Sequence, residues 1–123
     1  TMVSHRLWLA EDGDEPVAYA MAVHGEPTDP DIQAAVVSRP TLELSKIYVR
    51  ESHHGSGVAR HLLDEVLSEA VASNAHSVWL GVNQENIRAN RFYEKQGFVL
   101  RGTRFFQVGD STEADYVREL PLR

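Results

Sequence analysis

Residues 41–63 read TLELSKIYVRESHHGSGVARHLL, and three patterns within them decide the fold. Residues 41–50 alternate in hydropathy as a strand does, and the alternation slips between Leu44 and Ile47, which predicts a β-bulge. Two glycines follow in a short turn. From about residue 57 to residue 73, apolar side chains recur every three or four positions, as they do along one face of an amphipathic helix. The stretch therefore predicts a strand, a glycine turn and a helix.

The rest of the chain alternates between short apolar stretches and helical patterns. We expect the following elements in order: strands over 5–10 and 16–24 joined by a turn at 11–15, a loop over 25–40, a strand over 77–82, a helix over 86–96, and strands over 98–108 and 114–120. The first two strands are close enough in sequence to form an antiparallel hairpin. The strand–helix–strand unit from 41 to 82 implies a parallel pair, so we predict a mixed sheet.

Composition narrows the classes of function. The formal net charge of −6 disfavours nucleic acid or an anionic membrane as a partner, while it suits a cationic small substrate. Cysteine is absent, which excludes disulfides, thiolate metal sites and a cysteine nucleophile. The adjacent His53 and His54 lack the spacing of a metal site, so we expect no metal. Because neither a membrane-length apolar run nor a signal-peptide pattern is present, we expect a cytoplasmic location.

The turn over residues 53–59 reads HHGSGVA and immediately precedes the long helix. Its two glycines let the backbone approach a ligand closely, and amides at the start of a helix, where the dipole is positive, bind phosphate groups. The turn lacks the Gly-Lys-Ser/Thr ending of a nucleoside-triphosphate loop, and Arg60 stands where a dinucleotide fingerprint has its third glycine. A plain tight turn into a helix is the alternative interpretation.

A second group of polar residues follows the strand at 77–82. Asn86, Asn90 and Tyr93 share one face of the helix over 86–96, and Asn83 precedes that helix. Side-chain amides and a phenol along one stripe would line a polar, extended ligand. Each residue also has a structural interpretation, in which Asn83 or Asn86 caps the helix and Tyr93 is a half-buried core ring.

Together the two motifs resemble the cofactor-binding signatures of the GNAT superfamily of N-acetyltransferases. The signature Gln/Arg-x-x-Gly-x-Gly/Ala corresponds to HGSGVA at 54–59, after a strand that ends in IYV at 47–49. The second signature corresponds to NIRA at 86–89 followed by FYEKQGF at 92–98. The resemblance implies an α/β (α+β) acyl-CoA acyltransferase fold, with a mixed, mostly antiparallel central sheet and helices on both faces.

The resemblance also implies acetyl-CoA as cofactor and roles for individual residues. Backbone groups of Ile47, Tyr48 and Val49 would bond the pantetheine arm, and Tyr93 would donate a proton to the departing thiolate. The residues expected to bind the cofactor from the glycine turn and the second helix are His54, which replaces the usual Gln or Arg, Gly55, Ser56, Gly57, Val58, Ala59, Asn83, Asn86 and Asn90. Residues 1–123 are expected to form a single domain that begins at the family's second strand, without its first strand and two helices.

The chemistry of amide formation adds a candidate base. An alkyl amine that titrates near 10.4 is almost entirely ammonium at pH 7, so it must lose a proton before it attacks a thioester. Glu43, on the strand expected beside the acetyl group, is our candidate, and an ordinary exposed strand residue is the alternative. The sequence offers no nucleophile–base pair for a covalent intermediate, so we expect direct attack in a ternary complex.

We expect one of three functions. The first is acetylation of a small amine or polyamine, because ELSKIYV at 43–49, FQVG at 106–109 and DYV at 115–117 resemble bacterial polyamine acetyltransferases. The second is acetylation of a protein or peptide amine. The third is a non-catalytic acyl-CoA-binding module. Strands near the C-terminus leave a homodimer open.

Overall fold

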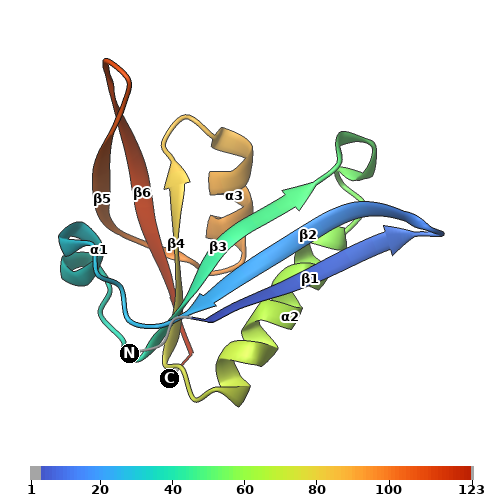
Figure 1. The fold of residues 1–123 in the computed structure, drawn as a ribbon, viewed down its shortest axis with the longest axis horizontal. Helices are drawn as coiled ribbons and strands as arrows, with labels where there is room; N and C mark the ends of the chain where they lie inside the picture. The colour runs from blue at the N-terminus through green and yellow to red at the C-terminus, as the bar shows by residue number, and fades with distance from the viewer. Residues whose placement is uncertain (1–3, 123) are drawn as a thin grey trace.

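The computed structural model describes residues 4–122, which fold into a six-stranded sheet with helices on both of its faces (Figure 1). The elements are, in chain order, β1 (Ser4–Asp12), β2 (Glu15–His24), α1 (Pro30–Ala35), β3 (Thr41–Val49), η1 (Glu51–His53), α2 (Val58–Ala72), β4 (Ser77–Asn83), α3 (Ile87–Lys95), β5 (Val99–Val108) and β6 (Ser111–Pro121). The strand order across the sheet is β1-β2-β3-β4-β6-β5. The predicted mixed, mostly antiparallel sheet is confirmed.

Strands β3 and β4 separate soon after they begin. Their parallel pairing joins Thr41 to Ser77, Leu42 to Val78 and Glu43 to Trp79, and it ends there. The other neighbouring strands of the sheet pair antiparallel. Beyond Glu43 the two strands diverge and leave an opening with α3 beside it (Figure 1). The sheet is therefore split at the one place where its strands run parallel.

The predicted bulge in β3 is confirmed at Ser45. On β2, Ala22 pairs with Leu44 while the preceding Met21 pairs with Lys46, so Ser45 has no partner of its own. The extra residue allows Leu44 and Ile47, which are an odd number of positions apart, to face the same core.

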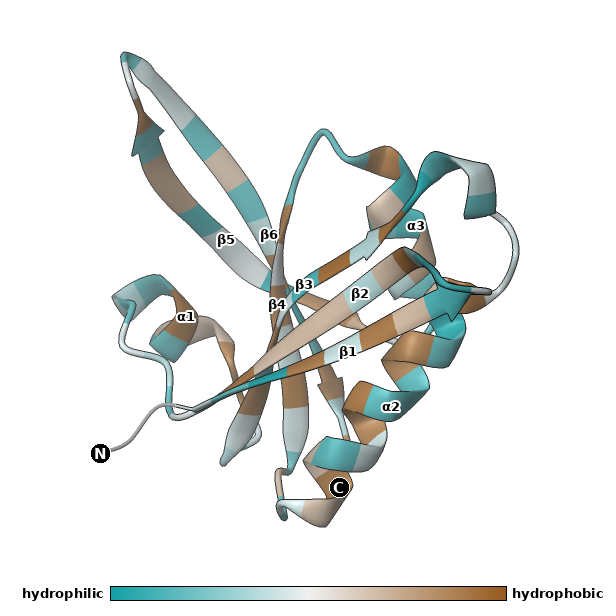
Figure 2. Cartoon of the chain, turned by 45° about the vertical axis from the view of Figure 1, so that its right-hand side comes forward, coloured by the Kyte–Doolittle hydropathy of each residue, from teal (hydrophilic) through white to brown (hydrophobic). Residues whose placement is uncertain are grey.

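Two hydrophobic cores lie on opposite faces of the sheet. On one face, α2 and the end of α3 pack against β2, β3 and β4. Figure 2 shows the alternation of apolar and polar residues along α2 that this packing requires. The smaller core, on the other face, joins α1 to the sheet and consists of Ile32, Val36, Trp79 and Val117. The expectation of helices on both faces is met.

The expectation that residues 25–40 form only a loop is wrong, because α1 lies inside this segment. The start of α1 is built locally: Asp29 accepts a hydrogen bond of 2.8 Å from the amide of Asp31, and Pro30 occupies the first turn. A helix of six residues is too short to show a helical period in the sequence, and Ile32 is its buried residue.

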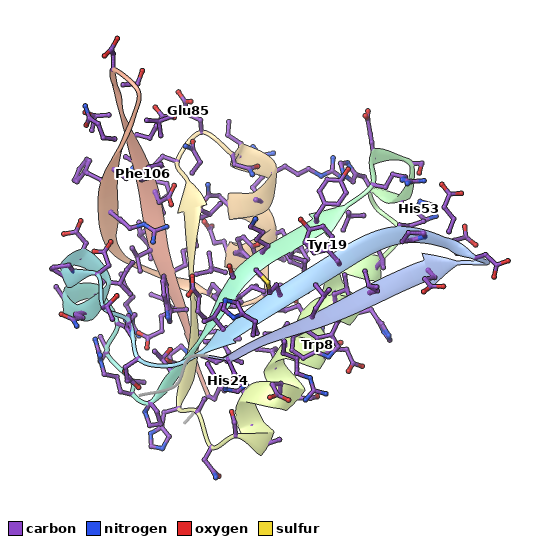
Figure 3. The ribbon with its side chains drawn as sticks, viewed as in Figure 1. Trp8, Tyr19, His24, His53, Glu85 and Phe106 are labelled. Carbon is purple, nitrogen blue, oxygen red and sulfur yellow. The ribbon has the colours of Figure 1, made fainter. Side chains whose placement is uncertain are left out.

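The β5–β6 hairpin extends away from the rest of the sheet (Figure 1). Near its tip Phe105, Phe106 and Val108 are exposed, and Phe106 stands on the hairpin in Figure 3. Between residues 4 and 122, no helix has both the length and the apolar character that crossing a membrane requires.

Candidate functional site

A cavity of about 1220 Å³ occupies the opening between β3 and β4, and we call it the β3–β4 groove. Three segments line it: the second half of β3, the glycine turn with the start of α2, and the chain from the end of β4 through α3. In Figure 3, Tyr19 of β2 and His53 of η1 lie on one side of the opening, and Glu85 of the β4–α3 loop lies on the other. A groove of this size accommodates a large organic ligand.

The glycine turn at one end of the groove depends on backbone conformation. Gly55 and Gly57 have φ angles of 80° and 88°, in the left-handed region that favours glycine, although neither would meet another atom within 4 Å if it carried a Cβ. His54 donates a hydrogen bond of 2.9 Å from Nε2 to the carbonyl of Val49. This bond fixes the turn against the end of β3.

The start of α2 is suited to an anion. The helix begins at Val58, and its first turn carries no acidic side chain. The first amides of a helix have no partner within the helix, and the helix dipole makes this end positive. Val58 and Ala59 line the groove, so these amides lie beside it. The turn can therefore hold a phosphate or pyrophosphate group.

The charge of the groove is opposite to that of the whole chain. The chain has a formal net charge of −6, yet the part of the groove built by residues 4–122 is lined by no aspartate or glutamate. Five of the chain's 12 lysines and arginines line it, namely Lys46, Arg60, Arg88, Arg91 and Lys95. Such a segregation of charge favours a ligand with several negative charges.

The three predicted asparagines differ in their position: two line the groove, and the third is buried beneath the β4–α3 loop. Asn83 and Asn86 line the groove, and Asn86 also caps α3 by accepting a 3.1 Å bond from the amide of Ala89. Asn90 is buried and is not among the described residues that line the groove. Its amide group donates to the carbonyls of Asn83 and Asn86 at 3.1 and 2.9 Å, and its oxygen accepts from Arg118 at 3.0 Å. Asn90 therefore fixes the path of the β4–α3 loop.

Tyr93 lines the groove and is 7% exposed. Phe92 and Phe98 meet its ring edge to face, with centroids 5.5 and 5.6 Å away. Burial raises the pKa of Tyr93 to about 12. The hydroxyl therefore stays protonated across the neutral range and can act as a hydrogen-bond donor in the groove.

A second cavity, of about 260 Å³, lies on the face of the sheet that α1 covers, and we call it the α1-face pocket. Its walls are formed by the end of β2, the loop before α1, and side chains of β3, β4 and β5. The lining residues include Glu26, Asp29, Glu43, Trp79 and Arg104. Glu43 is half-buried and makes no ion pair with the described residues. Burial raises the pKa of its carboxyl, and Arg104 and His5 oppose part of that rise.

Gly81 stands between the lining of the groove and a side chain of the α1-face pocket. This residue lines the β3–β4 groove, while a Cβ built on it would lie 2.6 Å from Nη2 of Arg104, which lines the α1-face pocket. Asp115 holds that guanidinium in place by accepting a 2.7 Å hydrogen bond from Nη2. A side chain at position 81 would therefore collide with Arg104, so this position requires glycine.

The structure brings most of the sequence-predicted site residues together. The predicted residues that line the groove are Ile47, Tyr48, Val49, His54, Gly55, Gly57, Val58, Ala59, Asn83, Asn86 and Tyr93. Ser56 is not among them, because its hydroxyl turns back to the carbonyl of His53 at 2.6 Å. Glu43 lies on the other face of the sheet, at the wall of the α1-face pocket.

Two groups of cavity-lining residues were not predicted: the cations of α3, and Trp79 with Arg104 in the α1-face pocket. Arg88, Arg91 and Lys95 stand at i, i+3 and i+7 of α3, a spacing that already places them on one side of the helix. Trp79 and Arg104 had no comparable signal, because their approach to Glu43 depends on strand pairing across the sheet.

Comparison with known proteins identifies a matching family and several relatives. The model of the family described as Acetyltransferase (GNAT) family matches residues 2–98. A Mycobacterium tuberculosis protein named as an uncharacterized N-acetyltransferase is 45% identical over 106 residues, which are 85% of this chain and 60% of that protein. The N-alpha-acetyltransferase 40 of Saccharomyces cerevisiae is 38% identical over 69 residues, which are 50% of this chain and 24% of that protein.

A solved structure supports the fold. An acetyltransferase of Salmonella typhimurium, determined with its cofactor acetyl-CoA, superposes with a TM-score of 0.75 at 21% identity, covering 97% of this chain and 65% of the other. The chain thus spans 60% of the length of its mycobacterial relatives and about two thirds of this structural neighbour.

Proposed function

Since the chain belongs to the GNAT family of acetyltransferases, we propose that it transfers the acetyl group of acetyl-CoA to a primary amine by direct attack in a ternary complex. The observation that carries this proposal is the β3–β4 groove, which joins a phosphate-binding glycine turn to a cationic lining in an acidic protein. Coenzyme A carries several phosphate groups and an extended arm, so it suits both features. The Salmonella neighbour is a protein of this fold that was solved with acetyl-CoA.

Particular residues would hold the cofactor. The amides of the glycine turn and of Val58 and Ala59 would bind the pyrophosphate, and the edge of β3 at residues 47–49 would bond the pantetheine arm. When bound, the cofactor supplies an acetyl thioester, whose carbonyl carbon the amine attacks. The N–C bond forms as the C–S bond breaks, so the amine must lose a proton and the thiolate must gain one.

Glu43 is our candidate for accepting the proton of the amine. An alkyl amine with a pKa near 10.4 is free in only about 1 molecule in 2,500 at pH 7. Glu43 lies where β3 and β4 part, beside the boundary with the groove, and lacks an ion-pair partner among the described residues. Because burial raises its pKa, it is a stronger base than an exposed carboxylate.

Tyr93 is our candidate for stabilising the departing thiolate. A thiol titrates near 8.5, whereas burial raises the pKa of Tyr93 to about 12. Complete proton transfer from the phenol is therefore uphill. We infer that Tyr93 stabilises the thiolate as a hydrogen-bond donor and that solvent completes the protonation.

Two classes of acceptor fit this chemistry. The sequence resemblance favours a small amine or polyamine, and the net charge of −6 suits a cationic acceptor of that kind. The similarity to a yeast N-alpha-acetyltransferase favours the amine of a peptide or protein.

Calorimetric titration tests the cofactor site. We expect saturable binding of acetyl-CoA and of desulfo-CoA, and we expect Gly57→Val to abolish both, because its side chain would occupy the space of the phosphate. The matched control is Gly109→Val, since Gly109 also has a positive φ, of 59°, and open space around it but lies in the β5–β6 turn. Absence of binding at millimolar cofactor, or unchanged binding by Gly57→Val, would refute the assignment. Acetylation of spermidine or a peptide amine then tests the reaction.

A further inference from the structure

Arg118 of β6 buries its charge with little to neutralise it. The residue is 5% exposed, and its Nε donates a 3.0 Å hydrogen bond to the side-chain oxygen of Asn90. Its Cζ lies 5.7 Å from the centroid of the Tyr116 ring. Among residues 4–122, the carboxylate in ion-pair range is that of Glu94, whose side chain is 74% exposed and lies 3.8 Å from Nη2. Burying a charge costs free energy, which a neutral acceptor and a distant carboxylate offset only in part.

Asn90 connects this guanidinium to the chain that lines the groove. Its amide group donates to the carbonyls of Asn83 and Asn86 at 3.1 and 2.9 Å. Asn83 is the last residue of β4 and Asn86 caps α3, so Asn90 joins the two ends of the β4–α3 loop. Arg118 belongs to the strand that pairs with β4. The hydrogen bond between Arg118 and Asn90 therefore fixes the loop relative to the sheet.

The loop in turn holds two side chains that line the groove, those of Asn83 and Asn86. The side-chain oxygen of Asn83 accepts from the amide of Glu85 at 2.9 Å, and that of Asn86 accepts from the amide of Ala89 at 3.1 Å. Because both oxygens are engaged within the loop, the NH2 groups are the ends that remain for a carbonyl or phosphate oxygen of a ligand. Their place in the groove depends on the path of the loop, and hence on Asn90.

We propose that Arg118 and Asn90 are a positioning pair for the cofactor. Neither is among the described residues that line the groove, and together they set the place of Asn83 and Asn86 within it. The planar guanidinium suits this task, because it donates in a fixed direction. The buried charge thus serves cofactor binding and costs stability. This inference rests on the proposed function, because it takes acetyl-CoA as the ligand of the groove.

A pair that only stabilised the fold would behave differently on substitution. Asn90→Leu removes the amide and leaves the buried Nε of Arg118 without this acceptor, so it should lower Tm. It should also raise the Kd of acetyl-CoA about tenfold, the size of about one lost hydrogen bond to the ligand. This variant alone does not separate the two roles, because a poorly folded protein also binds weakly.

The double variant Asn90→Leu with Arg118→Met separates them. It removes the charge together with the amide and leaves two apolar side chains in contact. Replacing buried polar or charged partners by apolar side chains is often neutral or stabilising. We therefore expect Tm to return to the wild-type value or to exceed it, while the Kd of acetyl-CoA stays raised about tenfold. Thermal unfolding and calorimetric titration with acetyl-CoA supply the two measurements.

Glu94→Gln is the matched control. It removes the exposed carboxylate and keeps the hydrogen bond between Arg118 and Asn90, and Glu94 is not among the described residues that line the groove. We expect it not to weaken acetyl-CoA binding. Weakening as large as that in Asn90→Leu would overturn the inference, because the ion pair would then carry the effect.

Two further outcomes would overturn the inference and leave the proposed function standing. The first is an unchanged Kd in Asn90→Leu. The second is recovery of Kd together with Tm in the double variant, because the pair would then act through folding alone. If the wild-type protein itself does not bind acetyl-CoA, the proposed function and the inference fail together.

Discussion

Glu43 combines a half-buried carboxylate with a position in the wall of the α1-face pocket, where the pairing of β3 with β4 ends, and its protonation should govern activity. Because burial raises its pKa, kcat/KM should rise with pH through a value above that of an exposed glutamate, as the base form appears. We expect Glu43→Gln to lower kcat about 100-fold and to remove this acid limb. The measurement is a pH profile of kcat/KM on the same acceptor. Glu85→Gln, on the exposed β4–α3 loop, should keep the wild-type profile; an unchanged profile in Glu43→Gln would exclude it as the base.

The ionised form of Glu43 should also lower the stability of the folded protein. A carboxyl whose folded pKa lies above its unfolded pKa binds more protons in the folded state, so stability falls as pH rises through that window. At neutral pH the folded state therefore holds a carboxylate that would be better solvated after unfolding. We expect Glu43→Gln to raise Tm at pH 7 and to change it little at pH 4. A lower Tm at pH 7 would mean that the carboxylate has stabilising partners in the folded state.

A substitution of Tyr93 tests how the departing thiolate is stabilised. We expect Tyr93→Phe to lower kcat roughly 10- to 100-fold, because one preorganised donor to the developing charge is lost, while the Kd of acetyl-CoA stays nearly constant. With a pKa of about 12, Tyr93 should add no basic limb to the rate profile below about pH 11. Tyr116→Phe, outside both cavities, is the control. A large rise in Kd with unchanged kcat would assign Tyr93 to cofactor binding alone.

At the scale of elements, Glu119 of β6 holds the segment after α1 in place. Its buried carboxylate accepts hydrogen bonds from the amides of Val37 at 3.1 Å and Ser38 at 2.9 Å, and from Arg101 at 2.9 Å. Burial acts to raise the pKa of Glu119, but hydrogen bonds from the amides of Ser38 and Val37 and from the side chains of Ser77 and Arg101 together outweigh it and leave the pKa lowered. One carboxylate thus ties the covering of the α1-face pocket to the sheet.

The lowered pKa of Glu119 predicts how the stability of the fold depends on pH. A group with a depressed folded pKa stabilises the fold above its unfolded pKa, and the contribution is lost as pH falls through the folded value. We expect Glu119→Gln to cost about 1–3 kcal/mol of unfolding free energy at pH 7, because an amide cannot accept from all three donors. The cost should shrink at acidic pH in denaturant titrations. Glu11→Gln, exposed on β1, should be neutral at every pH. Equal stability of Glu119→Gln and wild type at pH 7 would contradict this role of Glu119.

Local patterns in the sequence were sufficient to predict most elements of this fold and the turn that faces the groove. Long periodic segments such as α2, and glycines at positive φ such as Gly57, carry their signal in neighbouring residues. Helix α1 could not be predicted because six residues show no period. The internal hydrogen bonds of Ser56 and Asn90 are likewise invisible in sequence. The approach of Arg104 to Gly81 depends on pairing across three strands, which no local pattern encodes.

At the scale of the whole molecule, charge is segregated, and this should make cofactor binding sensitive to salt. The groove collects five cationic side chains in a chain of net charge −6, so counter-ions compete with a polyanionic ligand. We expect Arg88→Gln to weaken acetyl-CoA binding about 2- to 5-fold at low ionic strength, the range of one exposed charge pair. The effect should vanish near 1 M salt, where the screening length is about 3 Å. Arg6→Gln, on β1 and outside the groove, should not change Kd; salt-independent binding would contradict this account.

The short pairing of β3 with β4 has a further consequence, in the exchange of backbone protons with solvent. From Leu44 onward, β3 bonds to β2 along one edge, and its other edge faces the groove with no strand of residues 4–122 beside it. Backbone amides on that edge are open to water in the free protein and should exchange with deuterium quickly, although they belong to a central strand. A ligand that lies along this edge would close it as an added strand does. Protection confined to alternate amides of residues 44–49 would then mark the path of the pantetheine arm.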